Sequence, residues 1–205
     1  MRVLVIDYKA GNLTSVLKAL RHLGAEPEIT DSDCAMVEKA ERIVLPGVGH
    51  FAATERLDSS KLTPAIRATI ARGTPFLGIC VGMQWLYAGS SEAPGHPGLG
   101  FFRNQCERFP QAGAKVPHVG WNSLEVRSGS HLLRGVNEGD FVYFTHSYKA
   151  PITADTAAST DYIEPFAAAV ERSNVMGVQF HPEKSGETGL KILSNFLSWK
   201  GDGTA

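Results

Sequence analysis

The chain has 205 residues, of which 43% are hydrophobic and 20% charged, and its formal net charge at pH 7 is -1. A chain of this length can bury a full core within one domain, so residues 1–205 are predicted to form a single domain. The nearly balanced charge provides no broad electropositive field, which excludes nucleic acid as an expected partner.

Short apolar runs alternate with amphipathic segments in the first part of the chain. Arg2 to Ile6 has the pattern of a strand, and Asp7 interrupts it well short of a signal sequence or membrane span. This favours a cytoplasmic protein without a membrane association. Leucines at helical spacing predict a helix from Leu13 that ends at Gly24. Further strands are predicted at Glu26 to Thr30, Arg42 to Leu45 and Pro75 to Ile79, with a helix capped at Thr63-Pro64 and closing at Gly73.

The second part of the chain has a different texture. Pro94 to Gly139 is rich in glycine and proline, which predicts loops and short antiparallel strands. Ile152 to Glu164 is polar and rich in alanine and threonine, which predicts a surface loop. Strands are predicted at Phe141 to Phe144, Phe166 to Val170 and Val175 to Phe180, and a closing helix at Leu190 to Leu197. The whole pattern predicts an α/β fold with a mostly parallel central sheet covered by helices and a smaller antiparallel portion.

One cysteine stands where a predicted strand runs directly into a helix. Gly78 and Gly82 flank Cys80 two residues away on each side, as in nucleophile elbows, where a sharp turn exposes the reactive side chain. The helix N-terminus favours the thiolate, and the Val81 amide would point toward an oxyanion at the attacked carbonyl. The alternative is that Cys80 is a small buried hydrophobic residue. Cys34 and Cys106 lack the glycine frame and are predicted to be structural.

A thiol nucleophile needs a base, and the base needs an orienting group. His181 stands at the end of the last predicted strand and Glu183 follows two residues later, so the carboxylate can hold the imidazole in one tautomer. Such a pair alone is a weak signal, because it also occurs as an incidental surface contact. The other histidines include no pair at helical metal-ligand spacing, and neither a metal nor a cofactor is predicted.

The segment Leu45 to Gly49 is a glycine-rich turn after another predicted strand. Backbone amides of Val48 and Gly49 could complete an oxyanion hole together with Val81. An ordinary turn and a phosphate cradle are the alternatives, and the second is poorly supported without a following Lys-Ser/Thr pair.

Taken together, Gly78 to Gln84 and His181-Pro182-Glu183 resemble the triad signatures of class I glutamine amidotransferases. Their order of Cys, His and Glu differs from that of α/β-hydrolases. Within the class, the chain resembles the glutaminase subunits of imidazole glycerol phosphate synthases. That closer likeness rests on Asp7 to Leu13, Leu45 to Gly49, Pro117 to Asn122, Tyr143 to Tyr148 and Lys184-Ser185, and it extends from residue 1 to about residue 200.

The resemblance implies that the chain hydrolyses glutamine through Cys80, His181 and Glu183. It further implies delivery of the ammonia to a separate (β/α)8-barrel cyclase that makes imidazole glycerol phosphate in histidine biosynthesis, since the chain is too short to contain a barrel of ~250 residues as well. Glutamine-binding positions map onto Gln84, Glu92, Thr145, His146 and Ser147, and partner contacts onto Asn12, Trp121 and Lys184.

Two other functions fit parts of the pattern. A glutaminase serving pyridoxal phosphate synthesis belongs to the same class, but the Pro117 to Asn122 motif argues against it. A catalytically silent scaffolding subunit has no chemical need for an intact Cys80, His181 and Glu183. Ammonia release from glutamine, with and without a barrel partner, discriminates between these functions.

Overall fold

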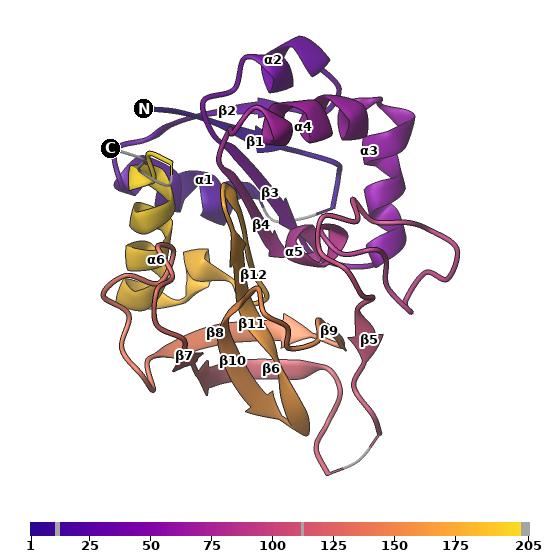
Figure 1. Cartoon of the computed structure of the whole chain (residues 1–205), viewed down its shortest axis with the longest axis vertical. Helices are drawn as coiled ribbons and strands as arrows, with labels where there is room; N and C mark the ends of the chain where they lie inside the picture. Colours follow the sequence, from indigo (N-terminus) through magenta and orange to yellow (C-terminus); the bar gives the residue numbers. More distant parts are fainter. Residues whose placement is uncertain (11–12, 112, 202–205) are drawn as a thin grey trace.

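The computed structural model describes residues 1–10, 13–111 and 113–201, and its centre is an eight-stranded sheet with the strand order β2-β1-β3-β4-β12-β11-β10-β7 (Figure 1). In chain order these strands are β1 (Arg2–Ile6), β2 (Glu26–Thr30), β3 (Ile43–Gly47), β4 (Phe76–Cys80), β7 (Glu125–Val126), β10 (Thr156–Tyr162), β11 (Glu164–Arg172) and β12 (Val175–Val178). Strands β2, β1, β3, β4 and β12 pair in parallel, and β12, β11, β10 and β7 pair antiparallel. The predicted mostly parallel sheet with an antiparallel portion is confirmed.

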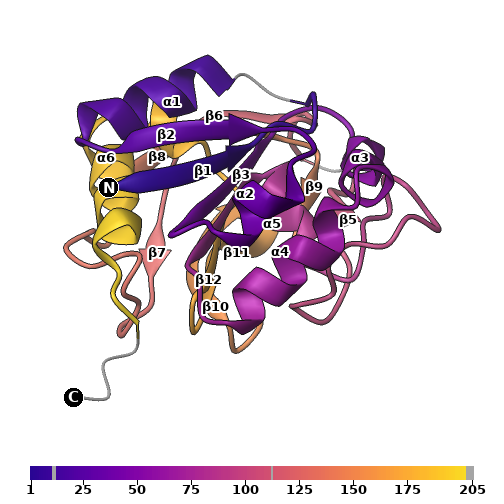
Figure 2. The same ribbon diagram turned by 90° about the horizontal axis from the view of Figure 1, so that it is seen from above.

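Helices cover both sides of the parallel strands. The helical elements are α1 (Leu13–His22), α2 (Cys34–Glu38), η1 (Phe51–Thr54), α3 (Glu55–Ser59), α4 (Leu62–Ala71), α5 (Val81–Trp85), η2 (Pro182–Lys184) and α6 (Gly186–Ser198). Seen from above, α1 and α6 lie on one side of the sheet and α2 and α4 on the other (Figure 2). Every residue of β3 and β4 is buried, which explains why these parallel strands are continuous apolar runs. None of the helices in the described ranges is both long and apolar enough to span a membrane.

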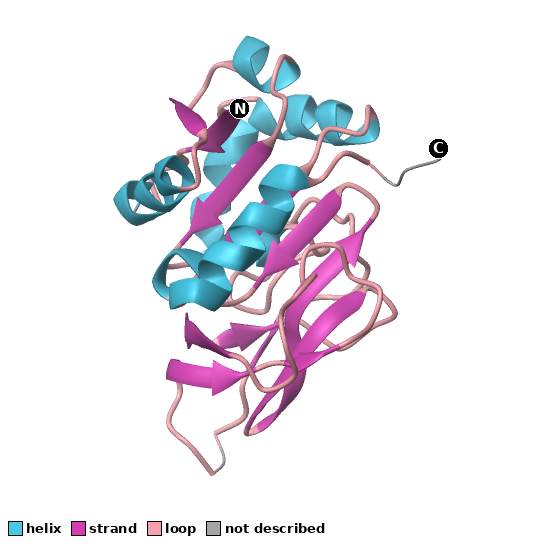
Figure 3. Ribbon diagram, turned by 90° about the vertical axis from the view of Figure 1, so that its left-hand side faces the viewer, coloured by secondary structure: helices cyan, strands magenta, loops and turns pink. Residues whose placement is uncertain are grey.

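Two short antiparallel pairs lie beside the main sheet (Figure 3). Strand β5 (Glu107–Arg108) pairs with β9 (Tyr148–Lys149), and β6 (His118–Ser123) pairs with β8 (Phe141–His146). These pairs come from the glycine- and proline-rich stretch and the segment that follows it. The prediction of short antiparallel strands there is confirmed.

The prediction of a surface loop from Ile152 to Glu164 is wrong. Residues Thr156–Tyr162 form β10 between β11 and β7, and its first five residues are buried. The side chains of this strand are mostly small, so they fit between neighbouring layers although their hydropathy is low. Serine and threonine can be buried here because their hydroxyls find partners, as when Thr160 Oγ1 donates to the Ser123 carbonyl at 3.0 Å.

Two helix and strand boundaries also differ from the prediction. Helix α4 begins at Leu62, and its N-cap is Lys61 in the left-handed region with φ 62° and no side-chain capping bond, so Thr63 is not the cap. Strand β12 ends at Val178, so His181 stands beyond the strand rather than at its end.

Candidate active site

Strand β4 and helix α5 meet in a sharp turn that carries Cys80. This residue is the N-cap of α5 with φ 54°, a left-handed conformation that few side chains adopt. A side chain at Gly78 would lie 2.5 Å from the Gly82 carbonyl oxygen, and one at Gly82 would overlap the Leu45 carbonyl oxygen. The two glycines therefore permit the close backbone approach that places Cys80 at the carboxyl end of the parallel strands, as the elbow pattern predicts.

The neighbouring strand β12 brings His181 to the same end of the sheet. The chain continues past the strand in an extended conformation, and the His181 amide donates to the Tyr143 carbonyl at 2.9 Å. Ser185 Oγ donates to the His181 carbonyl at 2.7 Å. The backbone of His181 is thus fixed by hydrogen bonds to β8 and to Ser185, which limits the directions in which its ring can point.

Glu183 curls back from η2 onto the imidazole. Its Oε1 lies 2.8 Å from Nδ1 of His181, and the side chains are only 2% and 4% exposed. The Nδ1 nitrogen is therefore committed to the carboxylate. In the described part of the chain Nε2 has no hydrogen-bond partner, so it is the nitrogen available to exchange a proton with Cys80 or a substrate.

The charges around the imidazole favour its protonated form. Burial alone lowers the pKa of His181, but the neighbouring Cys80 and Glu183 outweigh it and raise that pKa to about 10. A protonated imidazole beside a sulfur at a helix N-terminus is the arrangement that activates cysteine nucleophiles. Cys106, in contrast, is fully buried, and burial raises the pKa of its thiol.

A cavity of about 210 Å³ opens beside the sulfur. Its lining includes every residue that the sequence assigned to glutamine binding and, of the predicted oxyanion donors, Val81 and Gly49 but not Val48. The lining residues are Gly49, Cys80, Val81, Gln84, Glu92, Pro117, Thr145, His146, Ser147 and Tyr148. They come from segments far apart in the chain. The cavity therefore lies at the carboxyl ends of the strands, where α/β sheets bind ligands.

Two of the lining residues are already engaged within the protein. Gln84 is only 3% exposed, and its Nε2 donates to the Tyr148 carbonyl at 3.0 Å and to Gln179 Oε1 at 3.1 Å. Glu92 Oε2 accepts a hydrogen bond from the Phe51 amide at 2.7 Å. No described residue forms a hydrogen bond with Oε1 of either side chain, so both Oε1 atoms are available to a ligand.

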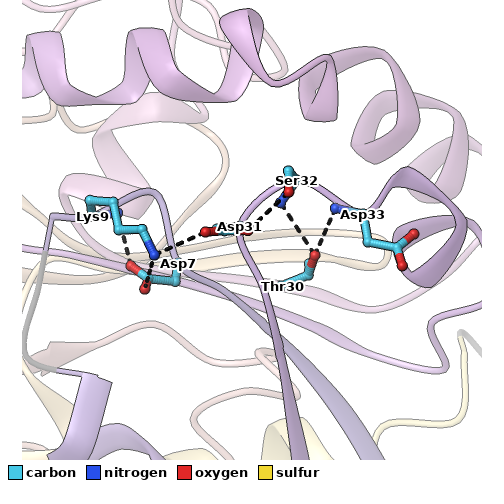
Figure 4. Close-up of polar contacts among 6 residues, drawn as sticks. All are labelled: Asp7, Lys9, Thr30, Asp31, Ser32 and Asp33. Carbon is cyan, nitrogen blue, oxygen red and sulfur yellow. Dashed lines mark hydrogen bonds and ion pairs between the residues drawn. The ribbon is translucent and has the colours of Figure 1, made fainter.

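The turn after β3 has one predicted donor facing away from the site. The Val48 amide donates to the Ala10 carbonyl at 3.2 Å, so in this arrangement it is not free to bind an oxyanion, contrary to the sequence-based expectation. Gly49 has φ 94°, which suits glycine alone. The loop that supplies Ala10 is held by Lys9, whose ammonium lies 3.2 Å from Asp7 and 2.9 Å from Asp31 (Figure 4).

Trp121 and Lys184 lie on one surface, around Tyr143. The Trp121 and Tyr143 rings are 6.1 Å apart, and the Lys184 ammonium lies 5.9 Å from the Tyr143 ring centre. Trp121 is 55% exposed, and Val119 and Phe141 of the same β6–β8 pair are exposed to a similar degree. Exposed apolar side chains therefore gather on this face of the β6–β8 pair. Asn12, the third predicted contact residue, lies outside the described residues.

Sequence reasoning missed two residues beside the sulfur. Gln179 is fully buried, and its Nε2 lies 3.5 Å from Cys80 Sγ. The sequence feature that could have indicated this residue is its polar side chain inside an apolar run. Tyr8 is 2% exposed, and its hydroxyl has no partner among the described residues. The hydroxyl fills the space that a side chain at Gly47 would need, which explains that glycine. Within the same residues, no group of three or more His, Cys, Asp and Glu side chains is arranged to hold a metal ion.

The largely parallel sheet, the cysteine elbow after β4 and the His181–Glu183 pair just after β12 together point to one class of protein. The family model described as Glutamine amidotransferase class-I matches residues 4–199, and the chain belongs to that family. Solved structures agree on the fold: a glutamine amidotransferase with 20% identity superposes with a TM-score of 0.74 over 95% of this chain and 98% of that chain. Another, from Thermotoga maritima, has 18% identity and a TM-score of 0.65 over 96% of each chain.

The sequence relatives narrow the class. The imidazole glycerol phosphate synthase subunit HisH of Aquifex aeolicus is 45% identical over 199 residues, which cover 96% of both chains. The subunit of the same name from Yersinia pseudotuberculosis is 42% identical over 198 residues, covering 96% of this chain and 99% of that one. Within the class I glutamine amidotransferases, the chain therefore belongs to the HisH family.

Proposed function

We propose that the chain hydrolyses glutamine to glutamate and ammonia and delivers the ammonia to a cyclase partner that makes imidazole glycerol phosphate in histidine biosynthesis. The main support for the proposal is that Cys80, at the sharp turn between β4 and α5, lies next to the buried His181–Glu183 pair and lines a cavity. Residues 1–205 act as one domain in this proposal, and the reaction takes place in the cytoplasm.

In the first half-reaction the Cys80 thiolate attacks the side-chain amide carbon of glutamine. The carbonyl oxygen becomes an oxyanion, and the Val81 amide at the start of α5 lies where it can bind it. His181 then transfers its Nε2 proton to the departing nitrogen, the carbon–nitrogen bond breaks, and ammonia leaves a thioester on Cys80.

The second half-reaction regenerates the thiolate. Neutral His181 removes a proton from water through Nε2, and the hydroxide attacks the thioester. The carbon–sulfur bond breaks, glutamate leaves, and the site returns to a thiolate beside an imidazolium. Glu183 stabilises the imidazolium and orients the ring, because its Oε1 lies 2.8 Å from Nδ1.

Substrate binding uses the cavity walls. A cavity of about 210 Å³ suits a small amino acid rather than a nucleotide. Thr145, His146 and Ser147 border it through the end of β8 and the residue after it, and the free Oε1 atoms of Gln84 and Glu92 complete the set. We assign the substrate's ammonium group to the acceptor oxygens of Gln84 and Glu92 in this wall.

The turn after β3, which includes Val48 and Gly49, is in a conformation that does not complete the oxyanion hole. Completing the hole from the β3 side requires Val48 to release the Ala10 carbonyl so that amides of Val48 and Gly49 can face the cavity. Partner and nucleotide would favour the active arrangement only if they bind it better than the idle one. Low activity of the isolated chain and stimulation in the complex follow from this requirement.

The partner in this proposal is a (β/α)8-barrel cyclase. We place its docking surface on the exposed face of β6 and β8, where Trp121 and Lys184 flank Tyr143, with Asn12 as a further contact. Tryptophan in such a position is a frequent binding hot spot, surrounded by polar contacts.

The test is ammonia release from glutamine, measured for the isolated chain, the complex with the cyclase, and the complex with the cyclase's nucleotide. Cys80→Ala should abolish ammonia release in all three samples, whereas Cys34→Ala, which alters a half-buried thiol far from the cavity, should retain it. Nucleotide should stimulate the complex. Activity that survives Cys80→Ala would contradict the proposed chemistry, and full activity of the isolated chain would contradict the proposed regulation.

A further inference from the structure

Gln179 lies in the short segment between β12 and His181. Its side chain is fully buried, and its backbone amide donates to the Ala168 carbonyl at 2.8 Å, so neither part of the residue is free to move. The side-chain Nε2 lies 3.5 Å from Cys80 Sγ, within hydrogen-bond distance for sulfur. A fully buried amide therefore faces the sulfur from the segment that follows β12 and leads to His181.

The direction of this hydrogen bond follows from the neighbouring amide. Gln84 Nε2 has two hydrogens, one donated to the Tyr148 carbonyl and the other to Gln179 Oε1. Because the Gln179 oxygen is thereby turned toward Gln84, its NH2 group is turned toward Cys80. The Tyr148 carbonyl is itself fixed, since His146 Nδ1 lies 2.8 Å from it.

Several other groups face the sulfur, and each acts differently. The Thr145 carbonyl, 3.9 Å away, can only accept a hydrogen bond and so favours the thiol form. His181 and, through it, Glu183 favour the thiolate by charge. Burial raises the pKa of the Tyr8 hydroxyl, so that group stays neutral. Gln179 is the neutral donor in this group that is oriented by its own hydrogen-bond partner.

We propose that Gln179 is a positioning residue for the Cys80 nucleophile: its side-chain amide, oriented by Gln84, donates to Sγ and holds the sulfur as a thiolate aimed into the cavity. The proposal rests on the proposed function, in which Cys80 is the nucleophile. A hydrogen bond to the charged form of a group stabilises that form, and it also limits rotation about the Cα–Cβ bond of Cys80.

The test uses the three cysteines of the full-length chain as reporters. Iodoacetamide alkylation is followed at each cysteine by mass spectrometry across a range of pH, in the wild type and in Gln179→Met, whose side chain has similar length but no amide. Cys34 is half-buried and distant, so it reports intrinsic reactivity, and Cys106 is fully buried, so its labelling reports loss of structure. Gln105→Met changes an exposed glutamine and is the matched control.

Hydrogen bonds to charged groups contribute about 1.5–3 kcal/mol, and the lower value corresponds to roughly one pH unit or tenfold in rate. We therefore expect Gln179→Met to raise the pH midpoint of Cys80 alkylation by about one unit and to leave Cys34 unchanged. In the complex, kcat for glutamine should fall about tenfold with little change in KM, because the amide touches the nucleophile and not the substrate. Gln105→Met should match the wild type.

If Gln179→Met exposes Cys106 to alkylation, Gln179→Glu is used as the test variant in its place. The glutamate carboxylate still accepts the hydrogen bond from Gln84 but places an oxygen, and no donor, against the sulfur. The same upward shift is expected. An unchanged midpoint and kcat in the variant that keeps Cys106 protected would overturn the inference. Glutaminase activity in Cys80→Ala would overturn the proposed function instead, so the two failures are distinguishable.

Discussion

A single methyl group at Gly82 tests the geometry of the elbow. The residue lies in the first turn of α5, and a side chain there would overlap the Leu45 carbonyl oxygen of β3, a backbone atom that cannot turn away. Gly82→Ala must therefore push α5 off the sheet. Since the Val81 amide and Cys80 immediately precede this position, the displacement moves the nucleophile and its oxyanion donor together.

The expected magnitude is set by two opposing effects. Replacing glycine by alanine inside a helix ordinarily stabilises by about 1 kcal/mol. Overpacking a buried contact costs about 1–3 kcal/mol and more where the backbone must shift, as it must at Gly82. We expect a net loss of about 2 kcal/mol in the free energy of unfolding, which lowers the melting temperature of a chain of this size by roughly 4–8 °C.

Urea denaturation and ammonia release measure the two consequences. Gly177→Ala is the matched comparison, because its nearest neighbours are side-chain atoms, Met83 Cγ at 2.8 Å and Val170 Cγ2 at 3.1 Å, and not a backbone carbonyl. We expect Gly177→Ala to be the milder change and to retain more activity. A Gly82→Ala variant that equals or exceeds the wild type in stability would refute the close-approach argument.

Three further predictions concern the base, the buried imidazoles and the docking face. His181→Ala should abolish glutaminase activity and Glu183→Gln should leave a residual rate, because an orienting carboxylate assists the base without replacing it; equal residual rates contradict these roles. Burial lowers the pKa of His118 to about 4 and of His146 to about 3, whereas the unfolded imidazoles titrate near ~6.5. The unfolded chain therefore binds more protons between these values, so the free energy of unfolding should fall as the pH drops below about 6.5. His118→Phe should reduce that fall in urea titrations at about pH 6.5 and 5, a range in which the raised pKa of His181 adds little further change. A pH-independent midpoint in the wild type would exclude the burial effect. Trp121→Ala should weaken binding of the cyclase, measured by calorimetry, without lowering the melting temperature of the isolated chain, because the ring is 55% exposed; unchanged affinity argues against this docking face.

The parallel half of the fold could be predicted because its sequence pattern is strong. Strands β3 and β4 are buried at every residue, so they are continuous apolar runs bounded by glycine and proline. Strand β10 has no such pattern, because its small Thr, Ala and Ser side chains are buried by their neighbours and not selected for hydropathy. Helix α4 begins from a left-handed Lys61, a conformation that no local capping pattern announces.

The residues of the candidate site likewise differ in how well their sequence surroundings indicate them. Cys80, His181 and Glu183, the proposed catalytic group, stand in short local motifs, and the structure brings them together at or just beyond the ends of the adjacent strands β4 and β12. The hydrogen bonds of Gln179 and Val48 depend on partners distant in the sequence, namely Gln84 and Ala10. Such contacts are set by tertiary packing, which periodicity cannot report.

The position of β12 has a consequence for how the chain becomes active during synthesis. This strand is inserted between β4 and β11, although it follows all the other described strands in the sequence. Until the ribosome has released it, the thiol of Cys80 has neither His181 beside it nor a closed sheet behind it. In the proposed mechanism, nascent chains that lack β12 cannot consume glutamine. The late, non-local pairing of β12 with β4 then completes the sheet and the proposed catalytic group in one folding event.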